Sequence, residues 1–485
     1  APSPPRRSTR TVNLRRAIVR DLSEAGIDPA HAYLEPSFYS ERYGLQGRLD
    51  VLYRDDHKSA IVELKSGKPF MPNIHGLSNN HFVQTLLYDL LIRSTFGRDS
   101  DPLSYILYSS QQERALRYAP RVGAQQYEAL QVRNHLLALE HLLAQLGAPG
   151  TDLLRDGRRL FGRLRPGRFP AARGFFRRDL ADFAAAFDGL DEVEQRYFTA
   201  YSGFIAREHR LAKTGVQGID RLNGQASLWL NSLEEKRDGF EVISHLQVLE
   251  NRAGEEEPLV TFAKTEATND LANFRRGDIA VLYPYLEGKP DVLNNQIFKC
   301  TILDITAAEV VVRLRSRQFN DALFQRVETW NLEHDLLDSG FLSLYRGLYA
   351  FAAAPRDRRD LLLGRRPPRQ GNDGAVTPPA ELTAEQQTIF RRILTAEDYF
   401  LLWGPPGTGK TSMMLKHLVD YLLNHTEEHL LLLAYTNRAV DEICEAIEAI
   451  GEHLRDHYLR IGSRYSAAER FRGQLLRAKT EQTSS

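Results

Sequence analysis

The sequence predicts a multidomain α/β protein, and three of its stretches carry that prediction. Between residues 47 and 91, acidic residues and a lysine lie on two short β-type runs that precede a helix. Five β-type runs separated by turns follow between residues 240 and 315, a spacing typical of a small barrel. From residue 399, a glycine-rich loop stands between an apolar run and a helix, which indicates a phosphate-binding α/β domain.

Acidic residues and a lysine mark the first stretch. Residues 49–53 and 60–65 are joined by a charged, turn-like segment, so we expect a β-hairpin that carries Asp50, Glu63 and Lys65. Because side chains alternate along a strand, Glu63 and Lys65 share one face, and the leucine between them is expected to point into the core. Two carboxylates there could hold Mg²⁺ or Mn²⁺ through oxygen, with the ammonium close to a phosphate. The plainer interpretation is a solvated, charged hairpin.

The helix expected from residue 81 adds a third motif. Gln84 and Tyr88 lie on one face of this otherwise apolar helix. The order Gly-x-x-Asp, Glu-x-Lys and Gln-x-x-x-Tyr, which begins at Gly47, resembles the RecB-type branch of the PD-(D/E)xK nucleases. The resemblance implies catalytic roles for Asp50, Glu63, Lys65, Gln84 and Tyr88, and a metal site formed by Asp50, Glu63 and, on the preceding predicted strand, Glu35.

Composition and charge limit the classes of protein that this chain can be. None of its 485 residues belongs to an apolar run long enough to span a membrane, and the arginine-rich start lacks the apolar core of a signal peptide. The 63 basic and 63 acidic residues balance, so nucleic acid would have to be bound by local patches. Cys300 and Cys444 offer neither a disulfide framework nor metal-ligand spacing. We expect a cytoplasmic protein without membrane contact, associated with the nucleoid if it is bacterial.

One basic patch lies between residues 155 and 178. It holds nine arginines and one acid, with four phenylalanines interleaved. Arginines among aromatic side chains suit phosphate contacts and base stacking, which makes Arg158, Arg159 and Arg163 candidate nucleic-acid-binding residues. A solvated loop with a few core phenylalanines is the alternative.

The second stretch combines β-type runs with a helical segment. The runs cover residues 240–243, 259–262, 278–283, 298–303 and 310–315. The helical residues after 334 resemble the stalk that packs a barrel onto the motor of Upf-like superfamily 1B helicases. Residues 365–380 have the composition of a linker.

The third stretch contains a Walker A loop. It lies between residues 399–403, which we expect to form a buried strand, and a helix expected from Ser412. Backbone N–H groups at the glycines would cradle phosphates, the lysine would reach the β- and γ-phosphates, and the threonine would bind Mg²⁺, so the loop predicts ATP as a cofactor. The candidate nucleotide-binding residues of the loop are Gly404, Gly407, Gly409, Lys410 and Thr411.

Residues on both sides of the loop resemble superfamily 1 helicases. Gln386 lies where their Q motif reads adenine. Residues 431–440 resemble motif Ia, a strand whose end contacts single-stranded nucleic acid, and this makes Thr436 and Asn437 candidate nucleic-acid-binding residues. Residues 459–462 look like the next strand. Because no Walker B acid pair, second RecA-like domain or arginine finger follows, we expect a truncated motor that binds ATP weakly and hydrolyses it negligibly.

The order of all these motifs resembles the nuclease–helicase family that trims Okazaki flaps and resects DNA ends. The resemblance implies a Mg²⁺-dependent nuclease for single-stranded or flap DNA, coupled to a superfamily 1B motor. That family pins its nuclease with four cysteines around an iron–sulfur cluster, and since no cysteine lies in residues 1–299 we expect no cluster here. A non-catalytic module that grips DNA ends or flaps, and an RNA helicase with a nuclease-like accessory domain, are the other functions considered. No protein partner is implied.

These interpretations divide the chain into five regions. We expect a PD-(D/E)xK nuclease domain with a basic segment at 155–178 over residues 1–215, a β-barrel over 216–330, a helical stalk over 331–364, a linker over 365–380, and the N-terminal part of a RecA-like P-loop domain over 381–485.

Overall fold

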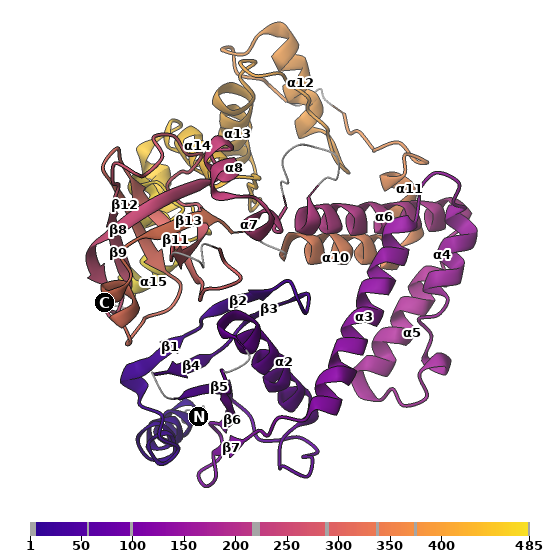
Figure 1. Ribbon diagram of the computed structural model, residues 1–485. Coiled ribbons are helices and arrows are strands. Elements are labelled where there is room, and N and C mark those ends of the chain that lie inside the picture. Colours follow the sequence, from indigo (N-terminus) through magenta and orange to yellow (C-terminus); the bar gives the residue numbers. More distant parts are fainter. Residues whose placement is uncertain are drawn as a thin grey trace. The chain divides into compact units, whose positions relative to one another are not determined.

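A computed structural model of the chain describes residues 6–55, 58–97, 100–215, 224–286, 291–335, 339–372 and 376–483 (Figure 1). The chain divides into two compact units, Ala1–Ala352 and Ala353–Ser485. The finer domain limits expected from the sequence stay predictions. Residues 216–223, where the barrel was expected to begin, and residues 373–375 of the expected linker lie outside the described residues.

A five-stranded sheet forms the N-terminal part of the first unit. Its strand order is β1-β4-β5-β6-β7, in which only β5 and β6 run parallel. The separate hairpin β2–β3 lies between β1 and β4 in sequence. The strands are β1 (Ala32–Leu34), β2 (Ser37–Ser40), β3 (Leu45–Arg48), β4 (Val51–Arg54), β5 (Ser59–Lys65), β6 (Leu103–Tyr108) and β7 (Leu116–Tyr118).

The hairpin predicted for the first stretch is present as β4 and β5, with Val51 opposite Val62 and Arg54 opposite Ser59. One detail of the prediction is wrong. Leu64 is 40% exposed, whereas Glu63 is only 3% exposed. The face that carries Glu63 is the one covered by helix α2 (Asn79–Phe96), so the polar residues point into the protein and the leucine points away from it.

Three helices frame this sheet. Helix α1 (Arg6–Arg16) continues into a π-helical segment, Ala17–Leu22, that packs on one side of the sheet. Helix α2 supplies Leu91 and Ile92 to a core shared with Leu49, Leu52 and Ile61 of the hairpin region. Helix α3 (Gly123–Gln145) is tied to α2 because the buried Gln126 amide donates to Asp89 at 2.9 Å.

A helical region follows the sheet. Four phenylalanines, Phe161, Phe183, Phe187 and Phe198, form a cluster of edge-on and stacked rings at its centre, and helix α10 adds Leu348 and Ala352 to the same core. Its helices are α4 (Leu153–Phe161), α5 (Gly174–Asp188), α6 (Glu192–Thr214) and α10 (Ser339–Ala353).

The predicted barrel is confirmed as a closed, six-stranded one, with the order β10-β11-β12-β9-β8-β13. Its strands and associated short helices are α7 (Ser227–Leu230), α8 (Leu233–Asp238), β8 (Val242–Arg252), β9 (Leu259–Ala263), β10 (Ile279–Pro284), β11 (Phe298–Ile305), β12 (Glu309–Leu314), α9 (Ala322–Arg326) and β13 (Trp330–His334).

Strand β13 closes the barrel and was not among the five predicted strands. It alternates apolar residues with Asn331 and Glu333, which look solvent-facing in the sequence but are 0% and 2% exposed. Both find partners inside: Lys236 donates to Glu333 Oε1 at 3.0 Å, and Asn331 Oδ1 accepts the N–H of His245 at 3.2 Å. The strand could not be predicted from an apolar pattern, because two of its buried residues are polar and are hydrogen-bonded inside the protein.

Barrel and sheet are joined by side-chain amides. Gln318, which follows β12, accepts the N–H of Leu34 at 3.2 Å and donates to the carbonyl of the same residue at 2.8 Å. Ser37 and Ile297 exchange two backbone hydrogen bonds, at 3.1 and 3.0 Å. The Gln225 amide donates to Tyr39 and Gln46 in the β2–β3 hairpin. The barrel and the sheet are therefore bonded to each other at Leu34, Ser37 and Tyr39.

The second unit consists mainly of helices in its described part. They are α11 (Arg356–Leu362), α12 (Ala384–Leu394), α13 (Lys416–His425), α14 (Asn437–Glu448) and α15 (Leu476–Thr483). A π-helical turn, Lys410–Leu415, leads into α13. The helix after the glycine-rich loop thus begins at Lys410, two residues before the expected Ser412.

Three apolar runs of this unit were predicted to be strands, and that prediction is wrong. Residues 400–403 and 430–434 have extended or irregular backbone without a ladder, and Arg460 forms only an isolated bridge with Leu475. Trp403 is 87% exposed. A parallel strand needs a neighbour to accept and donate its backbone hydrogen bonds, and within the described residues these runs have none.

Among the residues that the structure describes, no helix has the length and hydropathy needed to cross a lipid bilayer.

Candidate functional site

A close contact between β3 and α2 positions the first group of candidate residues. A methyl group on Gly47 would lie 2.6 Å from Leu91 and 3.2 Å from the Tyr88 ring, so only glycine allows this approach. The contact lets the Tyr88 hydroxyl donate to the carbonyl of Arg48 at 2.8 Å. The glycine of the Gly-x-x-Asp motif therefore has a packing role that fixes the helix against the loop carrying Asp50.

A chain of hydrogen bonds joins the end of β5 to α2. The Lys65 ammonium donates to Glu63 Oε1 at 2.6 Å and to Gln84 Oε1 at 2.9 Å. The Gln84 amide then donates to the Tyr88 hydroxyl at 2.8 Å. Gln84 and Tyr88 are one helical turn apart, and this spacing is what lets one side chain hold the other. The structure thus brings together Glu63, Lys65, Gln84 and Tyr88.

Asp50 lies beside the same group. It precedes β4, and its Oδ2 atom accepts the N–H of Leu64 at 2.7 Å, which places its carboxylate at the end of β5. Burial raises the pKa of Glu63, and the nearby charge of Asp50 raises it further, while Lys65 opposes the shift. Two acidic side chains this close repel each other unless a positive charge compensates them.

One atom of this group lacks a partner. The Oε2 atom of Glu63 is buried and makes no hydrogen bond. A buried carboxylate oxygen without a donor is costly, and a cation bound there would remove the cost. Asp50 and Glu63 together fit Mg²⁺ or Mn²⁺, because Mg²⁺ is commonly held by only one or two carboxylates together with water and substrate phosphate.

Glu35 lies apart from these two acids. Its carboxylate forms an ion pair with Arg48 at 2.9 Å, and both side chains are partly exposed. Its backbone is in the left-handed region, with φ of 50°, and its N–H donates to the carbonyl of Asp50 at 3.0 Å. Within the described part of the chain, no three His, Cys, Asp or Glu side chains gather closely enough to hold a metal ion, so Glu35 does not join Asp50 and Glu63 in a three-acid cluster.

Arg48 was overlooked in the sequence. It neutralises Glu35 with its side chain and accepts from Tyr88 with its carbonyl. Its position inside the Gly-x-x-Asp motif could have indicated a role for its side chain. The role of its backbone carbonyl could not be predicted, because every residue type has that group. His81, on the same helix face, contacts the Tyr108 hydroxyl at 3.2 Å, and burial lowers its pKa.

The glycine-rich loop of the second unit has the backbone that its sequence requires. Gly407 and Gly409 have φ of 83° and 77°, conformations that glycine adopts without strain. The Lys410 ammonium donates to the carbonyls of Gly404 and Pro405, so the side chain folds over its own loop. The loop ends at the N-terminus of the helix that continues into α13, where backbone N–H groups favour anions.

Gln386 is brought to this loop. Its amide donates to the Thr408 carbonyl at 3.5 Å, while its Oε1 atom accepts the N–H of Thr383 at the start of α12. Thr436 and Asn437 stand at the N-terminus of α14, where the Thr436 hydroxyl accepts the N–H of Ala439. Both are exposed, as a nucleic-acid contact would require.

Most arginines of the basic segment are engaged within the protein. Arg158, one of the three candidates, donates to Gln195 at 2.7 Å and pairs with Glu192. Arg165 makes two bonds to Asp188, each of 2.7 Å, and Arg178 lies over the Phe175 ring. The other two candidates, Arg159 and Arg163, make no hydrogen bond or ion pair with any other described side chain.

Comparison with known proteins gives one matching family model and several homologues. The sequence pattern of the AAA domain family matches residues 381–484. The DNA replication ATP-dependent helicase/nuclease JHS1 of Arabidopsis thaliana is 25% identical over 483 residues, covering 88% of this chain. The chain has homologues among the DNA replication helicase/nucleases. Those named DNA2 in Saccharomyces cerevisiae and Mus musculus are each 22% identical and cover 84% of the chain.

The homologues are much longer than this chain. The matched region makes up 35% of the Arabidopsis protein, 31% of the yeast protein and 40% of the mouse protein.

Proposed function

We propose that the chain is a metal-dependent DNA nuclease, acting on single strands or flaps and coupled to a superfamily 1B helicase motor in the whole protein. The observation that carries this proposal is the bonded group of Glu63, Lys65, Gln84 and Tyr88 beside Asp50, with one buried carboxylate oxygen left unsatisfied. The RecB-type PD-(D/E)xK fold of the first unit is part of the proposal. The homologues, each called a helicase/nuclease, support it.

Asp50 and Glu63 are the residues we propose as ligands of Mg²⁺ or Mn²⁺. A bound divalent cation would polarise the scissile phosphate and lower the pKa of water, which is the chemistry such sites supply. For Glu35 to join them, its carboxylate would have to leave Arg48. No iron–sulfur cluster is proposed, since Cys300 and Cys444 are both buried and lie in different units.

Lys65 is the proposed charge-stabilising group. The Lys65 side chain is 21% exposed, and its ammonium is held by Glu63 and by Gln84, so it is already ordered before a substrate binds. A fixed positive charge stabilises a phosphorane-like oxygen more than a mobile one, because no reorganisation accompanies the reaction. Gln84 and Tyr88 act through Lys65 and through the Arg48 carbonyl, and are positioning residues.

The second unit is proposed to bind ATP and Mg²⁺. Gly404, Gly407 and Gly409 supply the loop, and Lys410 and Thr411 would contact phosphate and metal. Gln386 lies close enough to the loop to contact a bound nucleotide. At the other helix start, Thr436 and Asn437 are proposed to contact single-stranded nucleic acid. Because the homologues are named for DNA replication, we propose that the protein acts in the nucleus or at the nucleoid.

The alternatives make different predictions for a single cleavage experiment. The chain is incubated with end-labelled flap DNA, single-stranded DNA and matched RNA, with Mg²⁺ and without ATP. We expect DNA cleavage that falls roughly 100-fold or more in Asp50→Asn and Glu63→Gln, the scale on which single charge-stabilising groups act. Glu113→Gln, an exposed acid on the same sheet region, is the charge-matched control. Cleavage of RNA alone would favour the RNA-helicase alternative, and binding without cleavage the non-catalytic one.

A second readout does not depend on activity. Mg²⁺ should raise the unfolding temperature of the wild-type chain, since a ligand that binds only the folded state stabilises it. The Asp50→Asn variant should lose this increase, and Glu113→Gln should keep it. An equal increase in all three proteins would contradict the assignment of Asp50 as a ligand.

The nucleotide site is tested separately. Lys410→Ala should weaken binding of a fluorescent ATP analogue at least tenfold, because it removes the cation closest to the phosphates. The same variant should cleave DNA as the wild-type chain does when ATP is absent. Loss of cleavage in Lys410→Ala would contradict the independence of the two sites.

A further inference from the structure

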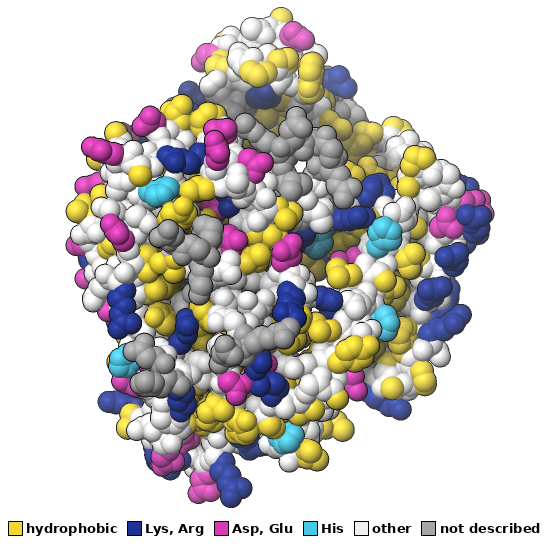
Figure 2. All heavy atoms as spheres, in the orientation of Figure 1, with side chains coloured by type: hydrophobic (Ala, Val, Ile, Leu, Met, Phe, Trp, Pro, Cys, Tyr) yellow, Lys and Arg dark blue, Asp and Glu magenta, His cyan; other side chains and the backbone are white. Residues whose placement is uncertain are grey.

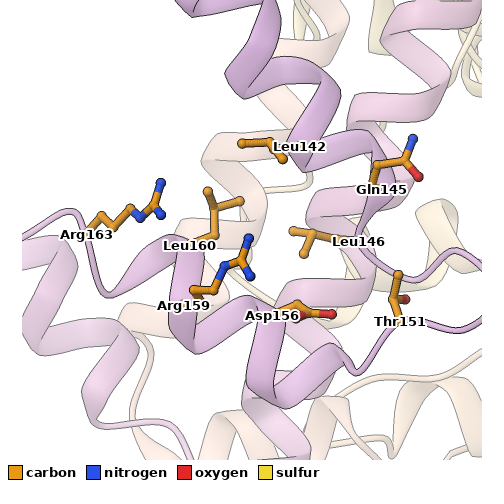
Figure 3. Close-up of a pocket in the computed structure, with 8 residues that line it drawn as sticks. All are labelled: Leu142, Gln145, Leu146, Thr151, Asp156, Arg159, Leu160 and Arg163. Carbon is orange, nitrogen blue, oxygen red and sulfur yellow. The ribbon is translucent and has the colours of Figure 1, made fainter.

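A cavity of about 180 Å³ lies between the C-terminal end of α3 and helix α4, in the basic segment (Figure 3). Leu142, Leu146 and Leu160 form its apolar wall, and Arg159 and Arg163 enter from the α4 side. Asp156, which is bonded to Arg155, lies next to Arg159 on the same helix. The cavity is far from the proposed metal ligands in sequence and contains none of them.

The walls of this cavity are held in place before any ligand arrives. A methyl group on Gly157 would lie 2.1 Å from Thr199 Oγ1, and one on Gly203 would lie 2.0 Å from the carbonyl of Leu146, so two glycines press α4 and the end of α3 onto α6. Arg207 of α6 donates to the carbonyl of Leu146 at 2.6 Å and so satisfies an orphan carbonyl at the end of α3. A cavity with fixed walls loses little conformational entropy on binding.

Two positive charges at the cavity are available to a ligand. Arg155, Arg158 and Arg165 are held by Asp156, Gln195 and Asp188 respectively. Arg159 and Arg163 make no such bond within the described part of the chain. Figure 2 shows dark blue side chains gathered along this edge of the first unit, which is the environment an anionic chain requires.

The cavity is large enough for one base of a nucleic acid. A leucine- and phenylalanine-lined cavity of about 150 Å³ in another protein binds benzene, so 180 Å³ accommodates one six-membered ring. An aliphatic wall with a polar end suits a nucleobase, whose face is apolar and whose edge carries donors and acceptors. The paired arginines suit the phosphate attached to it.

We propose that this cavity is a subsite for one nucleotide of a single DNA strand, with the base against the three leucines and its phosphate on Arg159 and Arg163. The proposal rests on the proposed function, because it supplies the nuclease with a second hold on its substrate. The proposal also reduces the number of arginines in the basic segment that are expected to bind DNA. Arg159 and Arg163 contact the DNA strand, whereas Arg158 stabilises the contact between α4 and α6.

Binding experiments in EDTA test the subsite without cleavage. Affinity of the full chain for an oligothymidylate is measured against salt concentration. Arg159→Gln combined with Arg163→Gln should lower the slope of log affinity against log salt by about 1.4, at about 0.7 per lost phosphate contact on a single strand. Arg15→Gln combined with Arg16→Gln, two exposed arginines of α1, is the charge-matched control and should leave the slope unchanged.

A variant that fills the cavity tests whether a base binds there. The wild-type chain should bind the oligothymidylate roughly tenfold more tightly than an abasic strand of equal length, because the leucines bury the apolar face of a base. Leu142→Trp should abolish that preference while keeping the salt slope. Unfolding midpoints equal to that of the wild-type chain show that each variant is folded.

Two results would overturn the proposal: a salt slope that the Arg159/Arg163 variant shares with its control, or equal affinity of the wild-type chain for abasic and base-containing strands. Because binding is measured without metal, a chain that fails to cleave DNA still tests the subsite. Conversely, normal cleavage by Asp50→Asn would contradict the proposed nuclease site without affecting the measurements of DNA binding at the cavity.

Discussion

Two tryptophans show how the two units differ. Trp330 lies in a run that alternates apolar with polar residues, whereas Trp403 ends an apolar run that looks like a strand in the sequence. Trp330 is fully buried in the barrel, where it contacts Phe262, Phe298 and Phe324. Trp403 precedes the glycine-rich loop and is 87% exposed. The run with the stronger strand signal in the sequence is therefore the one whose tryptophan is exposed.

The difference lies in the neighbours of each run. Strand β13, which carries Trp330, pairs with β10 on one side and β8 on the other, so its backbone groups are satisfied and its side chains enter a closed core. The runs at 400–403 and 430–434 have no ladder in the described part of the chain. Apolar periodicity shows that a segment can be a strand, and only a paired neighbour makes it one.

The largest effect is expected at the tryptophans themselves. Trp330→Ala should destabilise the first unit by about 3–5 kcal/mol, because it leaves a cavity among aromatic rings. Trp403→Ala should change stability by less than about 0.5 kcal/mol, as exposed substitutions usually do. Urea unfolding followed by far-UV circular dichroism measures both.

A Trp403→Ala cost as large as that of Trp330→Ala would erase the comparison. It would mean that the run before the glycine-rich loop is buried in solution and that the second unit packs as tightly as the barrel does. The m-value of each variant shows whether the unfolding reaction itself has changed.

Alanine substitutions at two glycines, one in each unit, compare how tightly the helices pack around them. Gly157→Ala in the first unit should cost about 1–3 kcal/mol, since its methyl group would meet Thr199 and force α4 away from α6. Gly473 of the second unit has open space around it, and Gly473→Ala should be neutral or stabilising by up to about 1 kcal/mol through the unfolded chain. Thermal unfolding of the paired variants distinguishes these outcomes, and a neutral Gly157→Ala would show that the α4–α6 contact is loose.

The smallest effect concerns ion pairs that hold the second unit. Glu448 Oε2 accepts from Arg455 at 2.9 Å and from Arg470 at 3.1 Å, and these contacts, Arg455 first, lower its pKa from 4.5 to about 2. A lowered pKa stabilises the folded state above the unfolded value, so this contribution is complete above pH 4.5 and is lost as the pH falls towards 2.

Glu448→Gln should therefore destabilise the chain near neutral pH, by up to about 1 kcal/mol for partly exposed ion pairs, and the loss should shrink as the pH falls below 4.5. Glu427→Gln, an exposed acid in the same unit, serves as the control. Unfolding midpoints between pH 2 and pH 7 provide the measurement. A difference between Glu448→Gln and the wild-type chain that stays constant over this range would exclude the ion pairs as its source.

Much of the candidate site follows from the sequence because its residues are close along regular elements. Gln84 and Tyr88 are one turn apart on α2, and Glu63 and Lys65 share a face of β5, so spacing alone predicts that each pair meets. The bond between Lys65 and Gln84 crosses from strand to helix. This bond could be predicted only from the order of the motifs along the chain, because the periodicity of a strand or a helix says nothing about contacts between the two.

Other features could not be predicted because they depend on packing between distant segments. Arg158 and Arg159 are adjacent and identical, and only the face that α4 turns towards α6 decides which is bound to Gln195. Leu64 and Glu63 exchange their expected places because α2 covers the polar face at the end of β5. The ion pair that keeps Glu35 from the other acids likewise depends on how the β2–β3 hairpin folds back.

The amide of Gln318 covers part of one edge of the N-terminal sheet. Strand β1 is the outermost strand of its sheet, and an uncovered edge strand offers unpaired N–H and C=O groups to the edge of another molecule. By binding both backbone groups of Leu34, Gln318 occupies the place that a strand from a second chain would take. A fragment with the sheet but without the barrel lacks this cover, so we expect it to self-associate through the edge of β1 more readily than the whole chain does.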